Sequence, residues 1–230
     1  MNIDNLTLGF LDAISAVICF VLVWFMSKPY RRIGERKYIG LPLAFSFLGA
    51  SLLMGLTRII ESVLFVDVMR WFQLFTQSYA FAFLATTYYF SRRRKGSNGL
   101  GVSLSFAAIL LVAMVSFIIF FVAPAYELPS FSNADDIMRI FNIVCLGYIS
   151  IQAIRSYATK PDFKTIWFPI GYILLGFSQY SFLLWSLDTS FWAFVGAHLL
   201  RFAALLLFML VTYQAFYTSS EGYSIIKEFE

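Results

Sequence analysis

The sequence has few of the residues that cover a water-facing surface. Only 13% of its 230 residues are charged, whereas 60% are hydrophobic and 20% are aromatic. Ordinary soluble domains are about 45–50% apolar and roughly 25% charged. A chain with so few polar side chains is suited to lipid as its solvent. We therefore expect an integral membrane protein with the lipid bilayer as its main partner.

Histidine is scarce as well, since the chain contains only His198. A haem held by two histidines, or a zinc ion held by three, is therefore excluded within this chain. The sequence also lacks a His-Glu-x-x-His motif, a nucleophile elbow and a phosphate-binding glycine loop. We expect no cofactor and no enzyme, although Asp12, Glu61 and His198 stay open as acid–base groups.

Cysteine is limited to two residues, Cys19 and Cys145, and both fall inside hydrophobic runs. A small apolar packing residue is the expected role there, rather than a disulfide partner or metal ligand. The N-terminus lacks the basic region and the cleavage site of a signal peptide. The first hydrophobic run is therefore expected to remain in the protein.

Long hydrophobic runs fill most of the chain. A helix needs about 20 apolar residues to cross a bilayer, whereas the strands of a membrane barrel show alternation over about ten. The runs are continuous, so we predict an all-α bundle of seven transmembrane helices over residues 1–218, followed by a tail at 219–230. The predicted spans are 6–27, 39–60, 68–91, 100–122, 137–156, 166–187 and 191–216.

Lysine and arginine gather in the loops after the first, third and fifth spans, which lie on one side of a seven-span bundle. Cytoplasmic loops carry the excess of these residues. The pattern predicts a cell-membrane protein with its N-terminus outside the cell and its C-terminus in the cytoplasm. The net charge of +4 reflects this orientation, so no nucleic-acid partner is expected. The basic loop residues are Lys28, Arg31, Arg32, Arg36 and Lys37, then Arg92, Arg93, Arg94 and Lys95, then Arg155, Lys160 and Lys164.

Two predicted spans resemble each other at their beginnings. When Leu41–Ser51 of span two is aligned with Phe168–Ser178 of span six, a proline, a leucine, a glycine and the final serine coincide. Spans three and seven match more weakly, through Thr87-Tyr88 and Thr212-Tyr213. The match suggests that spans one to three recur as spans five to seven in the same orientation, with span four as a linker. Chance similarity between apolar sequences is the alternative. A 3+1+3 plan resembles that of small sugar transporters.

Polar side chains inside the spans lie mostly in the half predicted to face outward. Burying such groups in lipid is costly, so they are candidate functional residues. If they point inward, they define a polar pocket open to the outside, in which Arg201 lies about 15 Å deep at ~1.5 Å per residue. The candidate ligand-binding residues are Asp12, Arg58, Glu61, Arg70, Gln73, Gln77, Asn142, Gln179, His198 and Arg201.

Each candidate also has a structural alternative. Arg58, Glu61 and Arg70 are close enough to a helix end to reach the lipid headgroups. A charge as deep as that of Arg201 should be paired or face water, so a structural ion pair with Asp12 or with Glu61 is its alternative. The four amide side chains suit hydrogen bonds between helices, and His198 suits a hydrogen-bonded packing role.

The predicted arrangement resembles that of the seven-helix input domains of some prokaryotic histidine kinases and cyclic-dinucleotide enzymes. It has seven spans, an outer polar pocket and a C-terminus that leaves the membrane on the cytoplasmic side. The topology is similar to that of opsins too, but span seven has no lysine for a retinal Schiff base. The resemblance implies a membrane sensor or receptor that signals through a cytoplasmic partner. A small-solute transporter and a structural subunit of a larger membrane complex are the alternatives. The positive charge of Arg58, Arg70, Arg139 and Arg201 favours a small anionic ligand.

Overall fold

The computed structural model describes residues 3–33, 39–56, 66–92, 99–122, 131–159 and 166–227. Over these ranges the chain forms seven α-helices and no strand, which confirms the all-α prediction. The helices are α1 (Ile3–Ile33), α2 (Gly40–Leu56), α3 (Val66–Arg92), α4 (Gly99–Val122), α5 (Phe131–Thr159), α6 (Trp167–Asp188) and α7 (Phe191–Lys227).

Five of these helices contain a stretch that is long and apolar enough to cross a membrane. The stretches are Gly9–Lys28, Gly101–Ile119, Phe131–Ala158, Trp167–Asp188 and Phe191–Gln214. The apolar helix α2 has 17 residues, and the end of the predicted span 39–60 lies outside the described residues. The 27 residues of α3 extend about 40 Å at ~1.5 Å per residue, but many of them are polar.

Several polar side chains of α3 are buried in the bundle. This helix packs against α2, α4 and α5. Thr76, Ser78 and Thr87 are buried, and each hydroxyl donates a hydrogen bond to the carbonyl one turn earlier, at 2.5, 3.1 and 2.8 Å. Donation of this kind satisfies a hydroxyl within its own helix. The low hydropathy of α3 is therefore accommodated inside the protein.

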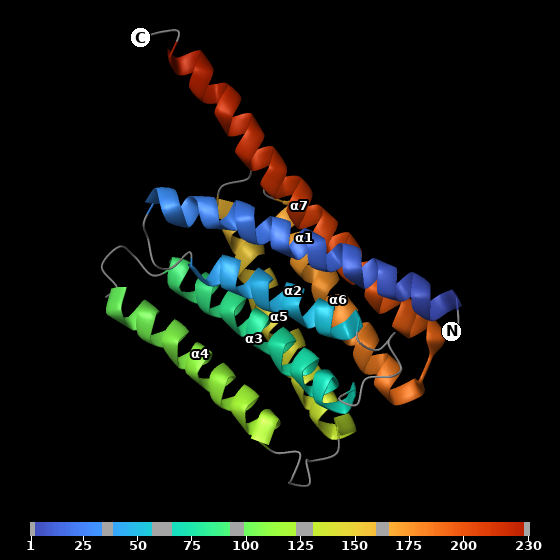
Figure 1. Ribbon diagram of the computed structural model, residues 1–230. Coiled ribbons are helices and arrows are strands. Elements are labelled where there is room, and N and C mark those ends of the chain that lie inside the picture. Colours follow the sequence, from blue (N-terminus) through green and yellow to red (C-terminus); the bar gives the residue numbers. More distant parts are fainter. Residues whose placement is uncertain are drawn as a thin grey trace.

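Six helices close into a ring, and α4 lies at its edge (Figure 1). Contacts run from α1 to α2, α3, α5, α6 and α7 in turn, and α7 returns to α1, whereas α4 packs on α3. The order of contacts in α1–α3 is repeated in α5–α7. This connectivity is what a parallel three-helix repeat with α4 as its linker would produce, and the repeat itself stays a prediction.

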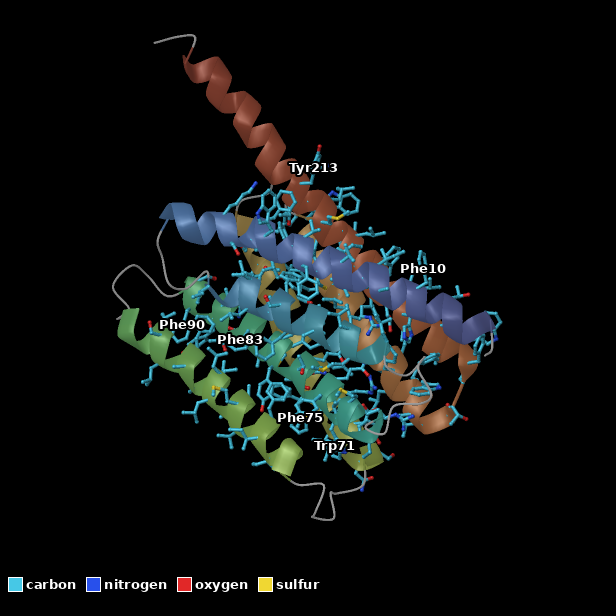
Figure 2. All side chains as sticks on the ribbon, in the orientation of Figure 1. Phe10, Trp71, Phe75, Phe83, Phe90 and Tyr213 are labelled. Carbon is cyan, nitrogen blue, oxygen red and sulfur yellow. The ribbon has the colours of Figure 1, made fainter. Side chains whose placement is uncertain are left out.

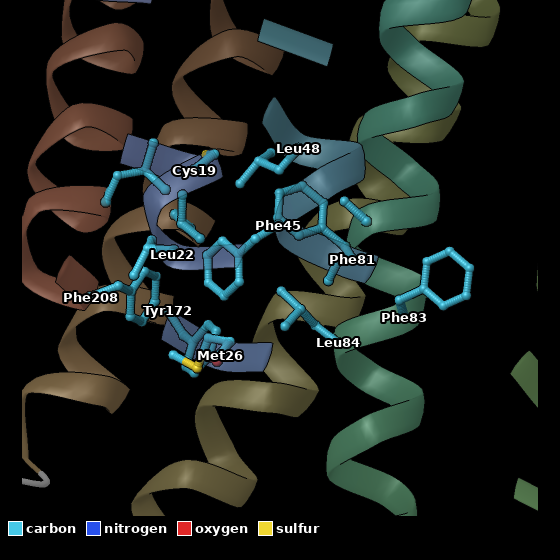
Figure 3. Packing of buried hydrophobic residues seen from close by; sticks show 14 of the residues in the cluster. Cys19, Leu22, Met26, Phe45, Leu48, Phe81, Phe83, Leu84, Tyr172 and Phe208 are labelled. Carbon is cyan, nitrogen blue, oxygen red and sulfur yellow. The ribbon is translucent and has the colours of Figure 1, made fainter. Parts of the chain in front are cut away.

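An apolar core lies between the helices, and Figure 3 shows part of it from close by. Its residues on α1 run from Ala16 to Met26 and so lie farther from the N-terminus than Asp12. Leu22, Phe45, Phe81 and Phe208 are fully buried there and come from α1, α2, α3 and α7. The ring of Phe208 lies 5.9 Å from that of Phe45 and 4.8 Å from that of Tyr172, measured between centroids. Edge-on and tilted contacts of this kind add to the packing of aromatic rings.

The outward surface of the bundle is apolar as well. Phe10 on α1 and Tyr213 on α7 point away from the bundle (Figure 2), with 68% and 51% of their surface exposed. On α4, Leu104, Leu111 and Met114 are each more than half exposed. Apolar exposure on this scale would be a liability in water. It suits a lipid bilayer and supports assignment to a membrane environment.

A tight connection joins α6 to α7 and positions one wall of the candidate site. Thr189 adopts a left-handed conformation with φ of 51°, and its backbone N–H donates to the carbonyl of Trp185 at 2.9 Å. A left-handed residue of this kind ends a helix and reverses the chain. The reversal brings Trp185 against Phe194, with ring centroids 4.7 Å apart.

The core predicts a difference between two substitutions on α7. Phe208→Ala removes a fully buried ring and should lower the free energy of unfolding by about 3–5 kcal/mol. Leu210→Ala alters a side chain that is 48% exposed and should cost roughly 0.5 kcal/mol. Thermal unfolding of both variants in the same detergent measures the difference, and equal losses would contradict the packing described.

Candidate polar cavity between six helices

A cavity of about 310 Å³ lies at the end of the ring near the N-terminus, and all six ring helices line it. It is bounded by the first turns of α1, α3, α5 and α7 and by the last turns of α2 and α6. Arg70 lines the cavity and is exposed, so the cavity reaches the molecular surface beside it. The apolar core described above closes the other end.

Asp12, His198 and Arg201 form a buried cluster in the cavity wall. A terminal nitrogen of Arg201, Nη2, donates to Oδ1 of Asp12, and Nε2 of His198 lies 3.5 Å from Oδ2. On the other side of the ring, Nδ1 of His198 lies 2.9 Å from the carbonyl oxygen of Phe194. His198 and Arg201 are three residues apart and so share one face of α7. The cluster joins the first helix to the last.

Burial sets the energetics of this cluster. The exposed fractions of Arg201, His198 and Asp12 are 2%, 5% and 7%. Charges removed from water require partners, and removing one partner from a buried pair costs far more than removing a pair at the surface. Asp12 and Arg201 therefore hold each other in place.

A second ion pair lies on α5. Nε of Arg139 donates to Oδ2 of Asp135 at 2.7 Å, and both residues are buried and line the cavity. Phe182 of α6 lies against the guanidinium groups of both Arg139 and Arg201, with its ring centroid 4.8 and 5.4 Å from the two central carbons. A desolvated aromatic face attracts such cations.

The wall formed by α3 contributes Arg70, Gln73 and Gln77. Opposite them, a Cβ at Gly55 would lie 2.9 Å from the side-chain nitrogen of Gln73, so glycine leaves room for this amide. Two of the buried nitrogens in this lining, Nε of Arg201 and Nε2 of Gln77, have no hydrogen-bond partner among the described residues. Two buried N–H groups are therefore available near the cavity.

The structure brings six of the ten predicted site residues together, although no observation tests their binding role. Asp12, Arg70, Gln73, Gln77, His198 and Arg201 line the cavity. Arg58 and Glu61 lie outside the described residues, and with them the alternative pair of Glu61 with Arg201. The alternative pair of Asp12 with Arg201 is present.

Asn142 and Gln179 do not line this cavity. Both are fully buried between α5 and α6, where Nδ2 of Asn142 donates to Oε1 of Gln179 at 3.3 Å. The structure thus gives these two amides the interhelical hydrogen bond that was the alternative to a ligand role.

Sequence reasoning left several lining residues out of the site. Arg139 lies in the predicted fifth span together with Asn142, but only Asn142 was among the candidate ligand-binding residues. Asp135 was placed before a span predicted to start at residue 137, whereas α5 begins at Phe131. The spacing of Asp135 and Arg139, four residues apart on a helix, was the signal available for that pair. No sequence signal indicated that Phe182 would contact two arginines from other helices.

The chain matches no protein-family model, no curated protein and no solved structure. Its function is therefore inferred from its own residues.

The Asp12–Arg201 pair predicts strong coupling between two substitutions. Arg201→Met leaves the Asp12 carboxylate buried without its main cation, and should lower the free energy of unfolding by about 3–5 kcal/mol. Adding Asp12→Asn removes the stranded charge and should restore most of that loss. Thermal unfolding of the wild type, both single variants and the double variant measures the coupling. If the losses of the two single variants simply add up in the double variant, the result would contradict a direct pair between Asp12 and Arg201.

Proposed function

We propose that this chain is a multi-pass membrane sensor or receptor whose cavity binds a small anionic solute from outside the cell. The observation that carries the proposal is the buried guanidinium of Arg201. It lines the cavity, and its Nε has no hydrogen-bond partner among the described residues. A guanidinium suits a carboxylate or another oxyanion because its N–H groups form a planar fork.

The balance of charge supports an anion. Among the described residues, three arginines line the cavity, Arg70, Arg139 and Arg201, against two carboxylates, Asp12 and Asp135. Three positive and two negative charges leave a balance of +1 with His198 neutral. A low-dielectric wall concentrates such a charge within a cleft.

The aromatic lining favours a ligand with an apolar part. Phe131, Trp185 and Phe194 border the same space as the cations. Small-molecule sites commonly combine apolar walls with a few polar groups that fix the ligand's orientation. A small organic acid has both features, and a volume of about 310 Å³ suits a molecule of that size.

The path of α7 supports a sensor. The helix carries both His198 and Arg201, and it continues well beyond the bundle (Figure 1). Its 37 residues extend about 55 Å at ~1.5 Å per residue. A ligand that draws Arg201 away from Asp12 would bias the position of α7 against α1, and the projecting part would carry this change to a cytoplasmic partner.

The proposal includes seven membrane spans, with the N-terminus outside the cell. The cavity end of the bundle would then face outward, and the ends of α1, α3 and α5, next to the basic loops, would face the cytoplasm. This orientation exposes the cavity to solutes outside the cell.

Thiol labelling of whole cells tests the orientation. Ser190→Cys, between α6 and α7, should react with a membrane-impermeant maleimide added to intact cells. Ser97→Cys, in the basic loop at the predicted cytoplasmic end, should react only after the cells are permeabilised. The wild-type chain, with Cys19 buried and Cys145 half-buried, provides the background. The reverse pattern would overturn the orientation.

Ligand-induced thermal stabilisation tests the anion site. Acetate, succinate, inorganic phosphate and sulfate are added separately to the purified protein, and at least one should raise its unfolding temperature. Arg201→Ala should abolish this rise because the cavity loses its deepest cation. Arg155→Ala makes the same change at an exposed position near the other end of α5 and should retain it. An equal rise in Arg201→Ala would sink the proposal.

A small-solute transporter is the second candidate, favoured by the ring's matching order of contacts in α1–α3 and α5–α7. Alternating access commonly uses two such halves around a shared site. Transport would require the apolar core around Phe45 and Phe208 to open. Uptake of a labelled anion into proteoliposomes would favour this candidate over a sensor, whereas purification within a defined assembly would favour a structural subunit.

A further inference from the structure

His198 presents both of its ring nitrogens to hydrogen-bond acceptors. Nδ1 lies 2.9 Å from the carbonyl oxygen of Phe194, and a carbonyl oxygen can only accept. Nδ1 must therefore carry a hydrogen and donate it. Nε2 lies 3.5 Å from Oδ2 of Asp12, whose other oxygen already accepts from Arg201.

The contact between Nε2 and Asp12 needs one more proton. In neutral histidine with a hydrogen on Nδ1, Nε2 holds only a lone pair, which would face the lone pairs of a carboxylate oxygen. A proton on Nε2 turns this repulsion into an ion pair. The alternative, a proton on Asp12, is opposed by Arg201, which stabilises the charged carboxylate.

We propose that Asp12 and His198 hold a bound proton between them, and that this proton strengthens anion binding in the cavity. The first part stands on the geometry of the cluster alone, and the second rests on the proposed function. The proton comes from water that reaches the cavity and settles on Nε2 of His198, and no bond between heavier atoms forms or breaks.

The other charged groups that border the cavity fix the sign of the effect. In the part of the chain that the structure describes, they comprise Asp12 on α1, Arg70 on α3, Asp135 and Arg139 on α5, and Arg201 on α7. The described parts of α2 and α6 add no charged side chain to the lining. Asp135 is engaged by Arg139, so the carboxylate of Asp12 is the acceptor that faces His198.

Protonation raises the balance of charge in the lining from +1 to +2. Anions should therefore bind more tightly at acidic pH, and by reciprocity a bound anion should favour the protonated histidine. A unit charge about 8 Å away, at an effective dielectric constant of about 30, changes affinity roughly tenfold. Histidine changes charge between about pH 5 and pH 8, which sets the range to examine.

Nitrogen NMR tests the bound proton directly, because the chain has a single histidine. Full-length protein labelled with ¹⁵N-histidine in lipid nanodiscs would give one pair of imidazole signals between about pH 5 and pH 8. At the acidic end both nitrogens should be protonated, and on raising the pH the proton should leave Nε2 while Nδ1 keeps its own. The proposal would be overturned if Nε2 carried no proton at any pH in this range. It would also be overturned if the neutral histidine carried its proton on Nε2 instead of Nδ1.

Asp12→Asn gives a second reading of the same signals. The new side chain has a similar shape, and its amide can donate to a bare Nε2, so Nε2 should stay unprotonated to a lower pH than in the wild type. Asp188→Asn removes an exposed carboxylate from the end of α6 and should leave the titration unchanged. Identical titrations in Asp12→Asn and the wild type would overturn the shared proton. If Asp12→Asn does not fold, the wild-type spectra decide alone.

Binding of sulfate and methanesulfonate tests the coupling, because both ions keep their charge over this range. Each should bind the wild type roughly tenfold more tightly near pH 5.5 than near pH 7.5, and His198→Asn should remove most of this difference. Binding that does not vary with pH would overturn the coupling and leave the anion site standing. No anion binding at any pH, with the expected NMR titration, would overturn the proposed function and the coupling but not the proton site.

Discussion

The buried pair between Arg201 of α7 and Asp12 of α1 is the constraint on which the closed ring depends. These residues are 189 positions apart in the sequence, and their contact brings the last helix against the first. In lipid, apolar side chains gain little by leaving one apolar environment for another, so packing alone gives weak direction to helix association. A charge that cannot face lipid supplies that direction, since each member of the pair needs the other.

This constraint divides the bundle along its length. Toward the N-terminus, charged and amide side chains from the ring helices surround a cavity, whereas aromatic and aliphatic side chains fill the remainder of the ring. The two regions depend on each other. The packed core around Phe208 holds α7 in register, and that register places His198 and Arg201 opposite Asp12. A polar cluster needs this rigidity because its hydrogen bonds tolerate little displacement.

Phe182 links the two ion pairs of the cavity without carrying a charge. Its ring lies against Arg139, Arg201 and the imidazole of His198, whose centroid is 5.0 Å away. The same aromatic ring thus attracts both cations, which offsets part of their mutual repulsion. Since His198 and Arg201 belong to the helix that leaves the bundle, the chemistry of the cavity and the position of α7 are physically connected.

The sequence by itself determined the all-α class, the position of most helices and the polar character of one end, because hydropathy and polar spacing are local properties. It also identified Asp12 and Arg201 as charged groups too costly to leave in lipid, and His198 as a candidate beside Arg201. Only the tertiary structure decided that α4 lies outside the ring, that Gln77 borders a cavity while Gln179 bonds to Asn142, and that Phe182 contacts two arginines. These outcomes depend on which helix faces which, and contacts between distant segments leave no periodic signal in either segment alone.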